Sequence, residues 1–238
     1  MYECAFPMLI EAWRAAFRAP SAPFVFVQLP AYVRQNDTAL AELREGQLAA
    51  ADRLAGVGFA CTADDGTGNG DIHNPNKSLV GRRMGAVVRA LLYGETGITH
   101  LSPRYASAAA TTAGGTATVT VALGPPEALA GAPLVWTPPS FESNGTWCPS
   151  DALGRTVYTV SCGWFEVQLS DSSWHNASAA IGADGASVVL SVSGAGELEA
   201  VATRNGYADF PVVNVYSSAG FPLVPWTPRN VSGGGGGA

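Results

Sequence analysis

The sequence is poor in charge and has almost no lysine. Charged residues make up 13% of its 238 residues, against about a quarter in an average soluble domain, and the formal net charge is −6. Lys77 is the one lysine among thirteen basic residues, and apart from Arg82-Arg83 the arginines are scattered. Because phosphate binding needs a dense stripe of positive charge, we expect no nucleic-acid partner.

Long apolar runs and metal-ligand motifs are also missing. No run approaches the roughly 18 apolar residues of a membrane-spanning helix, so we expect no membrane partner. The start has Glu3 in place of a basic segment and Pro7 inside the apolar stretch, which does not fit a signal peptide. None of the four cysteines forms a C-x-x-C pair, so zinc is not indicated, and we expect no cofactor or resident metal.

Asparagine and cysteine nevertheless point to a secretory or lysosome-like location. Five of the nine asparagines lie in N-x-[ST] sequons, which is more than chance gives: Asn36, Asn76, Asn144, Asn176 and Asn230. In an oxidising compartment Cys148 and Cys162, which flank a possible hairpin, would form a disulfide. For Cys4 and Cys61 both a disulfide and a free buried thiol stay open.

Residues 1–100 alternate between helical and strand patterns. Apolar residues at helical spacing predict helices over 5–18 and 39–55, and a third that Asn74 caps, Pro75 begins and Gly94 ends. Residues 24–29 and 57–61 are continuously apolar, as in parallel strands buried on both faces. This order indicates an α/β fold with a parallel sheet and flanking helices.

From about residue 101 to 230 the pattern becomes all-β. Short strand-like runs alternate with residues typical of turns and predict an antiparallel β-sandwich; the runs are 116–121, 164–169, 187–190 and 197–201. The glycine run that closes the chain predicts a disordered tail over 231–238.

His73 is the strongest candidate for a catalytic base. It follows the loop that leaves the second predicted strand and precedes a helix, which is where open α/β sheets bind ligands. Asp71 stands two residues earlier, so in an extended segment its carboxylate could orient the imidazole. The alternative is that this pair only caps a helix and solvates a loop. His100 and His175 are weaker candidates.

The same loop allows a second interpretation. Asp65, Thr67, Asn69 and Gly70 match a calcium-binding loop in part, but Asn76 stands where that loop has its bidentate glutamate. A serine nucleophile is not evident, because neither G-x-S-x-G nor G-D-S occurs, and Ser143 lies in the proline-rich part of the sandwich.

Six collinear segments resemble the sialate O-acetylesterase family, a branch of the SGNH-type carbohydrate esterases. They are YECAFPMLIEAWRAAF, PFVFVQLP, LREGQLAA, DIHNPNKSLVGRRMGAVVRALLYGE, SPRY and ATRNGYADFPVVNVYSSAGFPLVPW. The resemblance implies a partial SGNH-like parallel sheet followed by the sandwich, with an acetylated carbohydrate as substrate. It also implies a Ser-His-Asp mechanism in which His73 is the base and Asp71 orients it.

The sequence departs from the family at two points. Asn74 replaces the proline that follows the histidine, and the D-x-x-H spacing of the wider group is not kept, so Asp71, Asp65 and Asp64 all stay open as the orienting carboxylate. By resemblance the chain corresponds to the C-terminal half of such an enzyme, and its serine block would lie upstream of Tyr2. Such a half would expose a strand edge and helix faces. The alternative is a non-catalytic remnant or a glycan-binding sandwich, in which Trp147, Trp164 and Trp174 could stack on sugars.

Overall fold

The computed structural model describes residues 2–32, 38–66, 72–73, 76–137 and 165–233. Its first part is an α/β layer with a two-stranded parallel sheet, in which Phe24 lies opposite Val57 and Val27 opposite Ala60. The predicted parallel pairing is therefore confirmed. The elements are α1 (Tyr2–Ala16), β1 (Phe24–Val27), α2 (Ala39–Arg53), β2 (Val57–Ala60) and α3 (Lys77–Tyr93).

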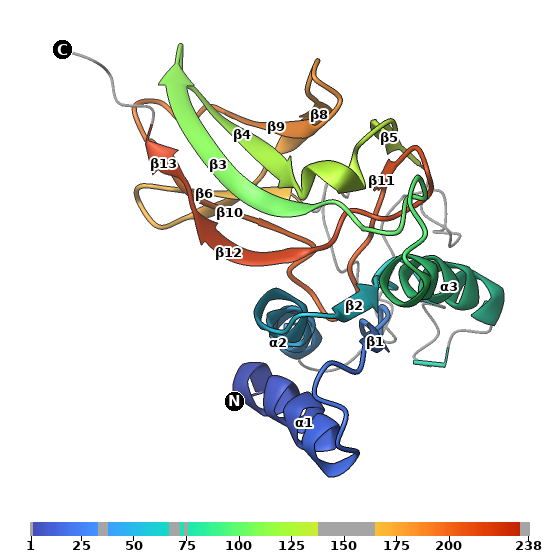
Figure 1. Ribbon diagram of the computed structural model, residues 1–238. Helices are drawn as coiled ribbons and strands as arrows, with labels where there is room; N and C mark the ends of the chain where they lie inside the picture. Colours follow the sequence, from blue (N-terminus) through green and yellow to red (C-terminus); the bar gives the residue numbers. More distant parts are fainter. Residues whose placement is uncertain (1, 33–37, 67–71, 74–75, 138–164, 234–238) are drawn as a thin grey trace.

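Helices cover both faces of this sheet. In Figure 1, α2 and α3 lie on opposite sides of β1 and β2, and α1 lies beside α2. Gly58 in β2 lets α3 come close, because a Cβ there would stand 2.5 Å from Leu91 and 2.7 Å from Val87. The α3 helix starts later than expected: its cap is Asn76, whose side chain accepts a hydrogen bond from the Leu79 N–H at 3.3 Å.

The second part consists of several mostly antiparallel sheets; two of them share an apolar core, and we call this part the sandwich. A five-stranded sheet has the order β13-β3-β4-β9-β8, a four-stranded sheet has the order β12-β10-β6-β7, and β11 pairs with β5. All strand pairs are antiparallel except β13 with β3. The elements are β3 (Arg104–Ala113), β4 (Thr116–Gly124), η1 (Pro126–Ala128), β5 (Leu134–Trp136), β6 (Phe165–Leu169), β7 (Trp174–Asn176), β8 (Ser178–Ile181), β9 (Ser187–Ser193), β10 (Ala200–Asn205), β11 (Val215–Ser217), β12 (Trp226–Asn230) and β13 (Ser232–Gly233).

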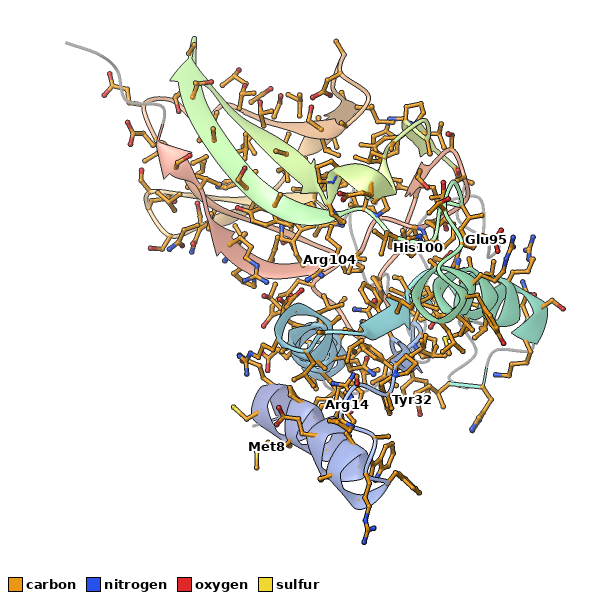
Figure 2. The ribbon with its side chains drawn as sticks, viewed as in Figure 1. Met8, Arg14, Tyr32, Glu95, His100 and Arg104 are labelled. Carbon is orange, nitrogen blue, oxygen red and sulfur yellow. The ribbon has the colours of Figure 1, made fainter. Side chains whose placement is uncertain are left out.

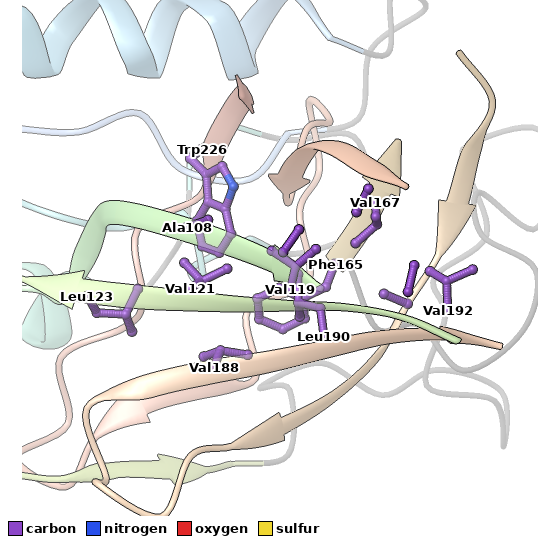
Figure 3. Packing of buried hydrophobic residues seen from close by; sticks show 14 of the residues in the cluster. Ala108, Val119, Val121, Leu123, Phe165, Val167, Val188, Leu190, Val192 and Trp226 are labelled. Carbon is purple, nitrogen blue, oxygen red and sulfur yellow. The ribbon is translucent and has the colours of Figure 1, made fainter. Parts of the chain in front are cut away.

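The core of the sandwich lies between the two larger sheets. Val119, Val121 and Leu190 from the five-stranded sheet meet Phe165 and Trp226 from the four-stranded one (Figure 3), and all five are buried. Alternation along β6, where Phe165, Val167 and Leu169 are buried and the residues between them are not, supplies this apolar face.

Further details differ from the sequence prediction. The long strand β3 was not predicted, because its alanines and threonines carry a weak apolar alternation. The strand expected at 197–201 lies at Ala200–Asn205 instead. The disordered tail was expected from residue 231, but Ser232–Gly233 form β13 and pair with β3; residues 234–238 lie outside the described residues.

The two parts meet along α2. Arg104 of the sandwich donates two hydrogen bonds to Asp52 of α2, at 2.7 and 2.9 Å, and lies between the two layers in Figure 2. Arg229 on β12 forms a second ion pair with Glu45. The division at residue 100 stays a prediction, but α2 clearly packs against α1, the sheet and the sandwich at once.

Candidate functional site

The candidate site lies at the carboxyl edge of the parallel sheet. Both strands run toward this edge, so the segments that follow them, 28–32 and 61–66, meet there. Arg83 of α3 bonds to the Cys61 carbonyl just beyond β2, which places the start of α3 past the same edge. This is the edge at which open α/β sheets bind ligands.

His73 lies in the segment that leads into α3, and it is exposed to solvent. The structure thus places the predicted base at the surface rather than in the core. Asp71, its predicted partner, lies outside the described residues, so the Asp71–His73 pairing stays a prediction. The expected calcium loop also falls largely outside them, since Thr67, Asn69 and Gly70 are not described.

Asp64, which the sequence left open as a carboxylate that orients His73, forms an ion pair with Arg83. Both of its carboxylate oxygens accept hydrogen bonds from Arg83, each at 2.7 Å, and both side chains are 5% exposed. A bidentate pair of this kind fixes the carboxylate in one orientation. Asp64 thus ties the end of β2 to α3, and which of Asp71, Asp65 and Asp64 orients His73 stays a prediction.

The Asp64–Arg83 pair also contacts the second part of the molecule, through Tyr216 on β11. The Tyr216 hydroxyl lies 3.1 Å from Asp64 Oδ2 and 3.3 Å from the Val213 carbonyl. Burial, followed by the negative charge of Asp64, raises the pKa of Tyr216. Burial alone would lower the pKa of Arg83, but the hydrogen bond and charge of Asp64 outweigh it and raise that pKa. At neutral pH the Arg83 side chain is therefore charged and the Tyr216 hydroxyl keeps its proton.

A second buried arginine shapes the loop after β1. Arg44 of α2 donates to four backbone carbonyls: those of Leu29 at 2.8 Å, Pro30 at 2.5 Å, Ala208 at 3.0 Å and Asp209 at 2.7 Å. Burial lowers the pKa of Arg44 to about 10, which leaves it charged at neutral pH. Arg44 thus fastens the segment 28–32, at the candidate site, to the segment that follows β10.

The buried thiol at this edge is not a nucleophile. Cys61 is 1% exposed, and burial together with the nearby Asp64 charge raises its pKa to about 12. Because the thiolate is the reactive form, Cys61 is inert at neutral pH. Both Cys4 and Cys61 are free, so the open question of their pairing resolves against a disulfide between them. Cys148 and Cys162 lie outside the described residues.

The other two histidines have local roles. His175 Nε2 lies 2.7 Å from the Ser173 hydroxyl, which donates to Asp171 on the same hairpin. In a catalytic triad the histidine stands between the acid and the serine, whereas here the serine stands between the other two. His100 Nδ1 lies 3.2 Å from the Ile98 carbonyl in the linker.

The described residues gather no cluster of metal ligands, and Arg204 covers one face of the Trp174 ring. Within the described ranges no three His, Cys, Asp or Glu side chains gather as metal ligands, and no helix there could span a membrane. Trp174 is half-buried, and the Arg204 guanidinium covers one ring face at 4.2 Å from its centroid. That face is not open for stacking on a sugar, and Trp147 and Trp164 are not described.

Sequence reasoning missed the two buried arginines. Arg44 and Gln47 share a helical face with Leu40 and Leu48, and all four are buried. A polar pair inside an apolar stripe was the available signal. Arg83 likewise stands four residues before the buried Val87 on α3.

Comparisons with known proteins agree with this architecture. No protein-family model matches the chain. The sialate O-acetylesterase of Mus musculus is 32% identical over 120 residues and that of Rattus norvegicus 31% identical over 120 residues; each match covers 43% of this chain and 22% of the relative. The structure of a carbohydrate acetylesterase from Xanthomonas citri matches with a TM-score of 0.72 and 26% identity, over 96% of this chain and 46% of that one. The chain therefore spans less than half of the solved relative.

Proposed function

This chain is related to the sialate O-acetylesterases, and from that premise we propose that it supplies the catalytic base and the accessory sandwich of an enzyme that hydrolyses acetyl esters on a carbohydrate. The observation that carries the proposal is that His73 is exposed and stands in the chain between β2, whose carboxyl end forms this edge of the sheet, and α3. A base must be reachable by substrate, and this edge is where the fold admits one.

In the proposed reaction His73 acts first as base and then as acid. It takes the proton of a serine hydroxyl as the serine oxygen attacks the acetyl carbonyl, and it returns that proton to the sugar oxygen as the ester bond breaks. Water then attacks the acetyl-serine with His73 again as base, which releases acetate and restores the serine. We propose that this serine belongs to sequence outside these 238 residues.

The orienting carboxylate is proposed to be Asp71, as the resemblance implies. Asp64 is already held by Arg83 through both oxygens, which supports its removal from the set. Asp65 is buried in the segment that follows β2 and is the remaining alternative.

We also propose a secretory or lysosome-like location. The exposed sequon asparagines Asn176 and Asn230 are compatible with it.

The test uses a fused polypeptide. The part of the Xanthomonas citri acetylesterase that lies outside its match to this chain, here named the complementary segment, is joined ahead of Tyr2. We expect acetate release from O-acetylated N-acetylneuraminic acid or from an O-acetylated neutral sugar, and the two substrates distinguish the sugar class. Asp71→Asn should reduce the rate about 100-fold or more, while Asp65→Asn should not. A folded fusion that releases no acetate from either substrate would refute the proposed function.

A further inference from the structure

The chain between β10 and β11 leaves the sandwich and passes along the parallel sheet. Residues 206–216, here called the crossing segment, follow β10 and reach into β11. In Figure 1 this orange stretch descends from β10 to the level of β2 and returns to β11. Connections between strands normally run over the surface and stay exposed. The crossing segment is instead mostly buried, which points to a role in the contact between the two parts.

The first half of the crossing segment is bound to the loop after β1 and to the start of α2. Arg44 donates hydrogen bonds to the Ala208 and Asp209 carbonyls, at 3.0 and 2.7 Å. The Tyr32 N–H also donates to the Asp209 carbonyl, at 3.1 Å. The Asp209 carboxylate in turn accepts a hydrogen bond of 2.6 Å from the Leu40 N–H in the first turn of α2. This half of the segment is therefore fixed to the side of β1.

The second half meets the segment 61–66, which follows β2 and leads toward His73. The Tyr216 hydroxyl donates to Asp64 Oδ2 at 3.1 Å. Phe210 lies so close to Gly66 that a Cβ at Gly66 would stand 2.8 Å from Phe210 Cε2. Glycine is required where two segments approach in this way. The sandwich thus contacts the segment before His73 at two separate positions.

An apolar cluster joins the same pieces. Val213 and Tyr216 of the crossing segment share a buried cluster with Leu48 of α2 and with Cys61 and Ala63 beyond β2. A close-packed cluster transmits displacements, because its members cannot shift independently. A change in the crossing segment would therefore move the end of β2.

The helix that follows His73 is held from the same side. Arg83 of α3 donates to the Cys61 carbonyl at 2.9 Å and pairs with Asp64, and it also lies 3.4 Å from the Gly220 carbonyl, just after β11. His73 is thus flanked in the chain by two anchors, the segment 61–66 and α3. Residues of the sandwich bond to both anchors.

We propose that the crossing segment positions the catalytic base, and that Tyr216 is the positioning residue through which the sandwich holds the segment before His73. Tyr216 is 8% exposed and acts through Asp64, not on the substrate. A base works only when its nitrogen is held in line with the proton it removes, so small displacements of its supports are costly. The inference rests on the proposed function for the role of His73.

The first experiment measures acetate release by the fused polypeptide with Tyr216→Phe, which removes one hydroxyl and leaves the Asp64–Arg83 pair. We expect kcat to fall about 10-fold or more at unchanged KM, since a displacement of about 1 Å can cost about 100-fold. Phe210→Leu, which withdraws a ring from Gly66, should lower kcat in the same way. If Tyr216→Phe does not fold, Phe210→Leu decides.

Tyr105→Phe is the matched control. The Tyr105 hydroxyl also donates to a buried partner inside the sandwich, the Asn230 carbonyl at 3.3 Å, but does not reach the segment 61–66. Its removal should leave kcat and KM native. Native kcat in Tyr216→Phe, a rise in KM alone, or an equal loss of kcat in Tyr105→Phe would each overturn the inference.

A second experiment needs no activity. In NMR spectra of the 238-residue chain, Tyr216→Phe should shift the ring signals of His73 and leave those of His175 in place, whereas Tyr105→Phe should shift neither. Unchanged His73 signals in Tyr216→Phe would overturn the inference. A fused polypeptide that folds with native Tyr216 and releases no acetate would instead refute the proposed function, and the His73 signals would then decide the positioning role alone.

Discussion

Asp64 and Arg83 face each other through two hydrogen bonds of 2.7 Å, buried between β2, α3 and the Tyr216 hydroxyl. The pair joins the end of a strand to the helix that follows the candidate base, and Tyr216 ties both to β11. The segment that carries His73 is therefore anchored on its two sides by the same ion pair.

Removing one partner of this pair should be far more harmful than removing both. Arg83→Met leaves a buried carboxylate without its cation, and we expect the free energy of unfolding to fall by about 3–5 kcal/mol. The double variant Asp64→Leu/Arg83→Met should recover a large part of that loss, because no charge stays buried. Urea denaturation measures both. Arg82→Met, at the exposed neighbouring position, is the control and should change little. Strictly additive effects of the two single variants would show that the residues are not coupled.

Even the conservative substitution Arg44→Lys should destabilise the protein. Arg44→Lys keeps the positive charge, but one ammonium group cannot reach four carbonyls spread over two segments. We expect a loss of about 3 kcal/mol in unfolding free energy, since buried acceptors are left without donors. Hydrogen exchange should also accelerate in residues 206–210. Arg53→Lys on the same helix has an exposed side chain and serves as the control. Equal stability of Arg44→Lys and Arg53→Lys would contradict the role of Arg44.

The raised pKa of Cys61 makes stability depend on alkaline pH. An unfolded thiol ionises near 9, whereas burial holds the pKa of Cys61 in the folded protein at about 12. Between these values the folded state binds more protons than the unfolded state, so stability falls as pH rises from 9 to 12, by up to about 1.4 kcal/mol per pH unit. Denaturation curves of the native protein and of Cys61→Ala should differ by this slope. If the stability of Cys61→Ala falls with pH as steeply as that of the native protein, the raised pKa of Cys61 is contradicted.

The parts of the fold in which a single hydrophobic periodicity dominates could be predicted from the sequence. The continuous apolar runs of β1 and β2 and the alternating strands of the sandwich were predictable, because each buries its apolar residues in a regular way. Hydrophobic periodicity could not reveal that Leu9, Trp13 and Phe17 stay exposed, because a periodic face does not say what covers it. Nor could it assign Asp64, whose partner Arg83 lies nineteen residues later in the chain, within α3.

The most direct test of the account is the effect of His73→Ala on kcat/KM for acetyl-ester hydrolysis by the fused polypeptide, with p-nitrophenyl acetate and the acetylated sugar as substrates. Loss of a general base costs about 10²–10⁴-fold, so we predict a decrease in that range, with an unchanged circular dichroism spectrum of the fused polypeptide. His175→Ala, on the β6–β7 hairpin, should retain native activity. Native turnover by His73→Ala, in a fusion that hydrolyses both esters, would contradict the central claim.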